Sequence, residues 1–164
     1  MNAFADHLPV LPVLLPSATA VVLLILGDHG GDAHGGHGHH RLLWARRIAL
    51  ASTLLFLVVA AQLAVDAAGG DVRAYRVGDW PAPYGIVLVV DRLGAMMLLL
   101  TAVVALPVVW YASGGWDAHG RHFHALFQFQ LMGLGGAFVT GDLFNLFVFF
   151  EVLLIASYVL MLHG

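Results

Sequence analysis

Long apolar stretches fill most of this 164-residue chain and restrict the folds open to it. A helix needs about 20 mostly apolar residues to cross the hydrocarbon core of a bilayer. Only 10% of the residues are charged, against about 25% in soluble domains. The chain is therefore predicted to be an all-α membrane protein with about five transmembrane helices. The five stretches are residues 8–26, 45–65, 86–111, 123–139 and 143–162.

The arginines indicate how the chain is oriented in a membrane. All seven basic residues are arginine. Four of them follow the first or the third apolar stretch, whereas Arg73 and Arg76 lie between the second and the third. Cytoplasmic loops carry an excess of basic residues. We therefore expect the N-terminus outside and the loop 27–41 in the cytoplasm.

Composition and motifs exclude several classes of function. Cysteine is absent, which excludes disulfides, thiolate catalysis and cysteine-ligated metals. A net charge of -3 provides no basic surface for nucleic acid. The sequence contains no glycine-rich phosphate loop, nucleophile elbow or zinc-protease motif. We expect neither a cofactor nor an enzyme that acts on a soluble substrate.

Glu151 is the first candidate for chemistry. It lies nine residues into the stretch 143–162, near the middle of the bilayer. The apolar side chains of this stretch contribute roughly -4 to -8 kcal/mol to insertion, which outweighs a cost of about +3 kcal/mol for a central acid. The helix is therefore expected to insert, and its carboxyl group can relay protons. The alternative is a neutral glutamic acid that joins two helices by hydrogen bonds.

The neighbours of Glu151 predict a buried helix face. Phe147 and Ile155 lie four residues to either side of it, and Tyr158 lies seven residues further on. All four residues share one stripe of a helix. Tyr158 is either part of a proton relay or an aromatic side chain that packs near the membrane interface.

Asp142 and Asn145 open the last apolar stretch. Asp142 is well placed as an N-cap, and Asn145 is the third residue after it. Helix capping is the simpler interpretation. A position at the outer mouth of an ion path is the alternative.

The fourth stretch carries polar residues on one face. His124 and Gln128 are four residues apart. They either line a hydrated path toward Glu151 or form hydrogen bonds between helices. Further along, Gly133 and Ala137 have the spacing that lets two membrane helices approach closely.

Asp91 and Arg92 lie five or six residues inside the stretch 86–111. Adjacent residues point in different directions on a helix, so these two cannot face one another. Arg92 is expected to extend toward the membrane surface. Asp91 is expected to form a structural ion pair with another helix of the same or a neighbouring protein.

The loop 27–41 is rich in histidine and glycine. His34, His37, His39 and His40 could bind zinc, nickel or copper. However, ordering a glycine-rich segment around a metal costs conformational entropy. We therefore favour a solvated insert and assign no metal site.

Three segments resemble the D-type membrane protein of the multisubunit Mrp/Pha-type monovalent cation/proton antiporters. The longest is residues 122–158, and its most distinctive part, residues 140–158, reads TGDLFNLFVFFEVLLIASY. Residues 75–93 and 7–16 fit the same family. The resemblance covers nearly the whole chain except the histidine-rich loop. This family is homologous to the proton-pumping membrane subunits of NADH:quinone oxidoreductase (complex I).

The resemblance implies a protein of about fourteen helices with an external N-terminus. It also implies that Glu151, on the fifth helix, works electrostatically with a lysine on the seventh. Such a protein would be a multi-pass subunit of a hetero-oligomeric antiporter in the bacterial inner membrane. It would exchange Na⁺ or K⁺ for H⁺, without a cofactor, as part of a secondary transporter.

The chain departs from the family pattern in two respects. It contains no lysine and stops after the fifth apolar stretch, so we expect residues 1–164 to be the N-terminal part of a longer subunit. Gly135 stands where the family pattern has asparagine, which removes a polar role from that site.

Three other interpretations remain open. The chain could be a proton-translocating subunit of a complex I-type oxidoreductase or a related hydrogenase. It could be a metal-handling membrane protein that uses the histidine-rich loop. It could also be an assembly scaffold that transports nothing.

Overall fold

The structure is a computed structural model that describes residues 7–26, 37–80, 84–120 and 122–163. Its side-chain description leaves out residues 37–39 as well. The elements are, in chain order, η1 (Leu8–Val10), α2 (Leu11–Leu26), α3 (His37–Ala68), β1 (Arg73–Arg76), η2 (Val77–Asp79), β2 (Val87–Val90), α4 (Arg92–Ala112), η3 (Trp116–His119), α5 (Phe123–Val139) and α6 (Leu143–Met161).

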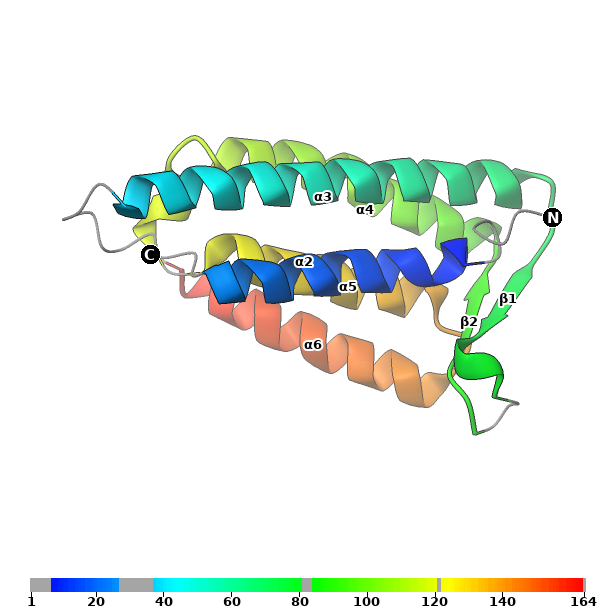
Figure 1. The fold of residues 1–164 in the computed structure, drawn as a ribbon. Coiled ribbons are helices and arrows are strands. Elements are labelled where there is room, and N and C mark those ends of the chain that lie inside the picture. Colours follow the sequence, from blue (N-terminus) through cyan, green and yellow to red (C-terminus); the bar gives the residue numbers. More distant parts are fainter. Residues whose placement is uncertain (1–6, 27–36, 81–83, 121, 164) are drawn as a thin grey trace.

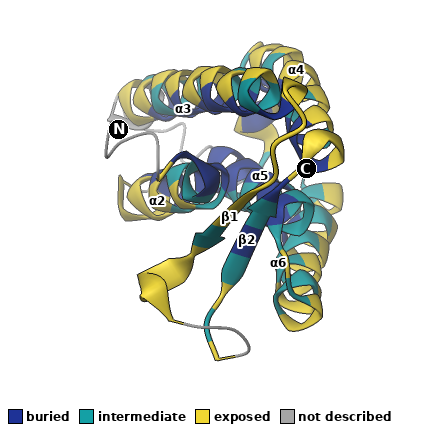
Figure 2. Ribbon diagram, turned by 90° about the vertical axis from the view of Figure 1, so that its right-hand side faces the viewer, coloured by how far each residue is buried: buried dark blue, intermediate teal, exposed yellow. Residues whose placement is uncertain are grey.

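The five α-helices form three layers (Figure 1). Helices α2 and α5 lie between the pair α3 and α4 on one side and α6 on the other. Buried residues concentrate on α5 and on the inner faces of α2, α3 and α4, whereas most of α6 is exposed or half-buried (Figure 2). The middle layer therefore holds most of the core.

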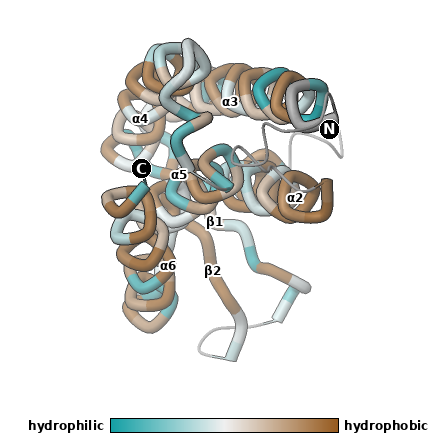
Figure 3. Tube along the Cα trace, turned by 90° about the vertical axis from the view of Figure 1, so that its left-hand side faces the viewer, coloured by the Kyte–Doolittle hydropathy of each residue, from teal (hydrophilic) through white to brown (hydrophobic). Residues whose placement is uncertain are grey.

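The helices have the length and composition of membrane spans. Among the described residues, four are long and apolar enough to cross a bilayer: Leu8–Leu26, His40–Ala68, Arg92–Ala112 and Leu143–Met161. The remaining helix, α5, is apolar but has 17 residues, which is about 25 Å of helix. Hydrophobic residues predominate along all of these helices, including their outer faces (Figure 3). The predicted all-α membrane fold is confirmed, with one small β-hairpin added.

That hairpin corrects the start of the predicted third stretch, 86–111. Residues 87–90 form β2, which pairs antiparallel with β1. The run Val-Leu-Val-Val is rich in β-branched residues and alternates between half-buried and buried positions, as strands do. Leu88 and Val90 point into the core. The helix therefore begins only at Arg92.

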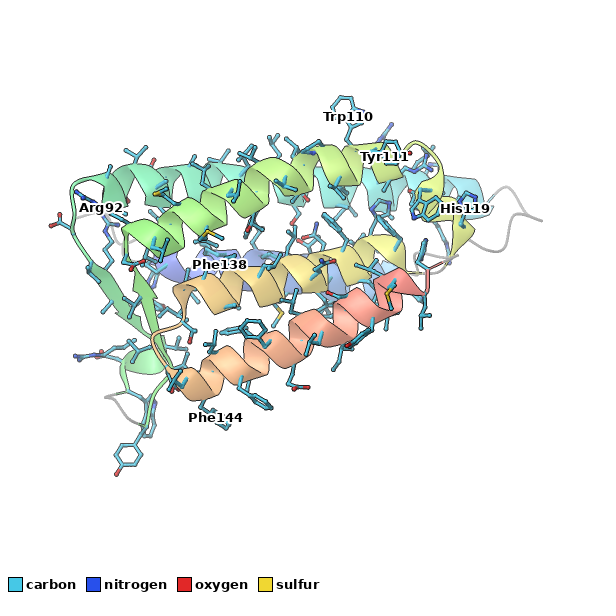
Figure 4. All side chains as sticks on the ribbon, turned by 180° about the vertical axis from the view of Figure 1, so that it is seen from behind. Arg92, Trp110, Tyr111, His119, Phe138 and Phe144 are labelled. Carbon is cyan, nitrogen blue, oxygen red and sulfur yellow. The ribbon has the colours of Figure 1, made fainter. Side chains whose placement is uncertain are left out.

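The prediction for Asp91 was wrong for the same reason. Asp91 is the N-cap of α4, where its Oδ1 accepts a hydrogen bond from the backbone N–H of Gly94 at 2.7 Å. Arg92 donates to the backbone oxygens of Ala67 (3.3 Å) and Ala68 (2.9 Å), at the C-terminus of α3. Figure 4 shows Arg92 at this end of the bundle. A cation is stabilised there because the last carbonyls of a helix lack partners within it.

The predicted loop 27–41 is shorter than expected at its C-terminal side. Helix α3 begins at His37. Leu42 and Ala45 are buried in the bundle, so their packing favours helix through this segment. Residues 27–36, including His34, lie outside the described residues.

Glycines of α5 set the spacing between the layers. A Cβ atom on Gly133 would lie 2.9 Å from the Cβ of Leu153 on α6, and one on Gly136 would overlap the Phe149 ring of the same helix. On the other side of α5, a Cβ atom on Gly135 would lie 2.6 Å from the backbone oxygen of Pro12. The close approach predicted from the small residues of this stretch is confirmed for Gly133.

Candidate functional site

The start of α6 fixes the position of its acidic residue. Asp142 accepts hydrogen bonds from the backbone N–H of Phe144 (3.1 Å) and from Nδ2 of Asn145 (2.9 Å). Asp142 is thus the N-cap of α6, as its place in the sequence predicted. Glu151 follows in the middle of this 19-residue helix.

Glu151 lies on the outer side of α6. Its side chain is exposed, and so are Phe147, Ile155 and Tyr158, with exposed fractions of 61%, 62% and 59%. Within the described residues, no hydrogen bond or ion pair reaches the carboxyl group of Glu151. The predicted stripe exists, but the prediction that it is buried within this chain was wrong.

The glycine contacts explain which face of α6 is buried. Leu153 and Phe149 pack against Gly133 and Gly136 of α5. These two side chains lie on the side of α6 roughly opposite to Glu151, because two residues turn a helix by about 200°. Glu151 therefore faces away from the other four helices.

A buried polar cluster connects α2, α3 and α5 in the middle layer. Gln128 is fully buried; its Nε2 donates to Thr53 Oγ1 (3.2 Å) and to the backbone oxygen of Ala49 (3.3 Å). Its Oε1 accepts from Ser52 Oγ (3.2 Å), and Thr19 Oγ1 in turn donates to Ser52 Oγ (2.9 Å). These bonds join three helices through one amide.

A second buried polar cluster closes the end of the bundle where α3 begins. Asp117 of η3 is 1% exposed. Its Oδ2 accepts from Arg46 Nε (2.7 Å) and lies 2.8 Å from His124 Nε2, while its Oδ1 accepts from Arg46 Nη2 (2.7 Å). A two-point contact between arginine and carboxylate is both strong and directional. It fixes η3 to α3 and α5.

The surroundings of Asp117 keep its carboxyl group ionised. Burial alone would raise the pKa of Asp117, but hydrogen bonds from His124 and Arg46 and their positive charge outweigh burial and lower the pKa to about 2. Sequence reasoning missed this residue. Its signal is that Asp117 is the single acid between the third and fourth apolar stretches, seven residues before His124.

The structure does not bring the predicted polar residues together. His124 and Gln128 form hydrogen bonds with η3 and with α3, rather than facing Glu151 on α6. The hypothesis of a path from them to Glu151 was therefore wrong for this chain, and hydrogen bonding between helices was the correct alternative.

The structure adds no support for a metal site. The described residues contain no group of three metal-binding side chains. His40 is exposed, and its ring lies 6.2 Å from that of Trp44. The side chains of His37 and His39 lie outside the described residues, as does His34.

Stacked apolar helices, with one acid in the middle of the last of them, define a multi-pass membrane protein of the ion-translocating class. No family model matches the chain. However, it is 46% identical over its whole length to a probable K⁺/H⁺ antiporter protein of the D type from Rhizobium meliloti (strain 1021), of which it covers 29%. Over 97% of its length it is 37% identical to the D-type protein of a Na⁺/H⁺ antiporter of Alkalihalophilus pseudofirmus, of which it covers 30%.

A solved structure leads to the same family. A chain of the Mrp complex from Dietzia sp. DQ12-45-1b superposes on 97% of this chain with a TM-score of 0.83 and 29% identity, and 27% of that chain is covered. The chain belongs to the D-type family of multisubunit cation/proton antiporter proteins. It spans about 30% of the length of the curated relatives that it matches.

Proposed function

We propose that this chain acts within a multisubunit antiporter that exchanges Na⁺ or K⁺ for H⁺ across the bacterial inner membrane, with Glu151 as a proton-carrying group. The observation that carries this proposal is the position of Glu151. It is the single charged residue of α6 and lies at the middle of that helix, on a face that the other described helices leave open.

An acid in that position requires a partner. A charged side chain that faces lipid at the bilayer centre costs about 3 kcal/mol. The cost falls if another helix supplies a cation or hydrogen-bond donors, and the family resemblance implies a lysine for this role. A cation that approaches Glu151 favours the charged form, and one that withdraws favours the neutral form. Glu151 would therefore release and take up protons as its neighbour moves.

The proposal also concerns partners and orientation. We infer that the open face of α6 packs against further helices of the antiporter complex, and that the N-terminus lies outside. The arginines that follow the first and third apolar stretches support this orientation.

Purified complexes test the function directly. The complex that contains this chain should be reconstituted in vesicles and given a Na⁺ or K⁺ gradient, with internal pH as the readout. We expect cation-driven proton movement without NADH or quinone, and co-purification with other antiporter proteins. Proton movement only on addition of an electron donor would contradict the proposal and support the oxidoreductase alternative.

A further inference from the structure

A groove opens between α3, α4 and η3, at the end of the bundle closed by Asp117. It has a volume of about 730 Å³ and is lined by Leu50, Trp110, Tyr111, Trp116 and His119, with the loop 113–115 between α4 and η3. Figure 4 shows Trp110, Tyr111 and His119 around this end of α4. This volume is within the range of ligand sites in proteins.

The walls of the groove have the chemistry of a membrane interface. Trp110, Tyr111 and Trp116 are exposed by 73%, 82% and 53%. Tryptophan and tyrosine gather where lipid headgroups meet acyl chains, because their rings are apolar at one end and polar at the other. The groove therefore lies at the depth of the headgroups.

The edge of the groove is cationic. Arg47 is exposed and lies about one helical turn before Leu50, on the same face of α3. Its guanidinium is 5.8 Å from the centre of the Trp44 ring, which is itself half exposed. The salt bridges of the described residues do not include Arg47, and the carboxylate of Asp117 is bound to Arg46. The exposed charge at this edge is therefore positive.

The ion pair of Arg46 with Asp117 gives the groove a fixed shape. Asp117 lies between Trp116 and Ala118 in η3, and its carboxylate is held at two points by α3. The Nδ1 atom of His119 is 3.2 Å from the backbone oxygens of Gly115 and Trp116. These contacts hold one wall of the groove in place before any ligand binds.

We propose that this groove binds an anionic phospholipid of the cytoplasmic leaflet, with its phosphate at Arg47 and its glycerol region against Trp110 and Trp116. Basic pockets between transmembrane helices on the cytoplasmic side bind such headgroups. The inference depends on the membrane fold and the orientation from the arginines, but not on antiport.

Quenching of tryptophan fluorescence by brominated lipids tests the proposal. The chain has four tryptophans, and a Trp80→Phe background leaves Trp44, Trp110 and Trp116, all at this end. The full chain is reconstituted in phosphatidylcholine bilayers that contain brominated phosphatidylglycerol or brominated phosphatidylcholine. We expect stronger quenching by the phosphatidylglycerol.

Substitutions at arginines assign the effect to the groove. Arg47→Gln should reduce the apparent affinity for phosphatidylglycerol about five-fold, since one arginine near an anionic surface contributes about that factor. Arg47→Lys should retain most of it. Arg76→Gln, at an exposed arginine of the hairpin, should have no effect.

Several results would overturn the proposal. They are equal quenching by the two lipids, equal loss in the Arg76→Gln variant, or loss of the excess quenching on addition of inorganic phosphate, which would indicate a free-anion site.

Discussion

Arg46 and Asp117 form a two-point ion pair, with Nε–Oδ2 and Nη2–Oδ1 distances of 2.7 Å each. The Asp117 side chain is fully buried, whereas that of Arg46 is 21% exposed. The pair joins the start of α3 to the short helix η3, 71 residues later in the chain. It is therefore a long-range tie at the end of the bundle.

Removal of Arg46 should destabilise the protein strongly. In Arg46→Gln the buried carboxylate loses its main donor, and we expect a loss of about 3 kcal/mol in the free energy of unfolding. The measurement is denaturant unfolding in detergent micelles. Arg41→Gln, at an exposed arginine of the same helix, should change stability by about 0.5 kcal/mol or less. Equal losses in the two variants would show that the ion pair contributes nothing specific.

The low pKa of Asp117 predicts a particular dependence of stability on pH. Because the pKa falls from 3.8 to about 2 on folding, the ionised carboxyl group contributes roughly 2 kcal/mol. This contribution is complete above about pH 4 and is lost as the pH falls toward about 2. Melting temperatures measured from neutral pH down through this window report it. Asp117→Asn should flatten the curve there, whereas Asp71→Asn, at an exposed acid, should leave the curve unchanged.

Gln128 holds three helices together. Replacement by leucine removes its hydrogen bonds and leaves Ser52 and Thr53 with fewer partners. We expect a loss of about 1 to 2 kcal/mol in the free energy of unfolding, since hydrogen bonds between membrane helices contribute at this level. Gln62→Leu is the matched control, because Gln62 is exposed and bonds only within its own helix. A Gln128→Leu variant as stable as the parent would contradict this role.

Gly133 sets the distance between α5 and α6. In Gly133→Ala the new methyl group would lie 2.9–3.0 Å from Leu153, including its backbone. We expect a loss of about 1 to 3 kcal/mol in the free energy of unfolding, together with faster proteolysis of α6. Gly69→Ala is the control, since a Cβ atom there meets nothing closer than 3.9 Å. If both variants behave like the parent, the helices do not depend on this contact.

Length and composition alone predicted the five helices, because the bilayer requirement acts on each stretch separately. Asp91 shows where this reasoning stops. An apolar run of valine and leucine before it is compatible with a strand or a helix, and the pairing with Arg73–Arg76 decides between them. That pairing depends on residues far away in the sequence.

The site was predicted in identity but not in surroundings. Helix α6 is apolar on all sides, so its sequence does not indicate which face packs against α5. The face is chosen by Gly133 and Gly136 on another helix, which places Glu151 outward. Asp117 was missed because its importance arises from Arg46, a partner that no local pattern reveals.

The most direct test of the central claim is cation/proton exchange by the reconstituted antiporter complex with Glu151→Gln. The Gln side chain keeps the shape of Glu151 but cannot carry a proton. We predict that the Glu151→Gln complex assembles normally and loses both Na⁺/H⁺ and K⁺/H⁺ exchange, whereas Asp71→Asn retains exchange. An assembled Glu151→Gln complex that exchanges at the parent rate would contradict the claim that Glu151 carries the proton.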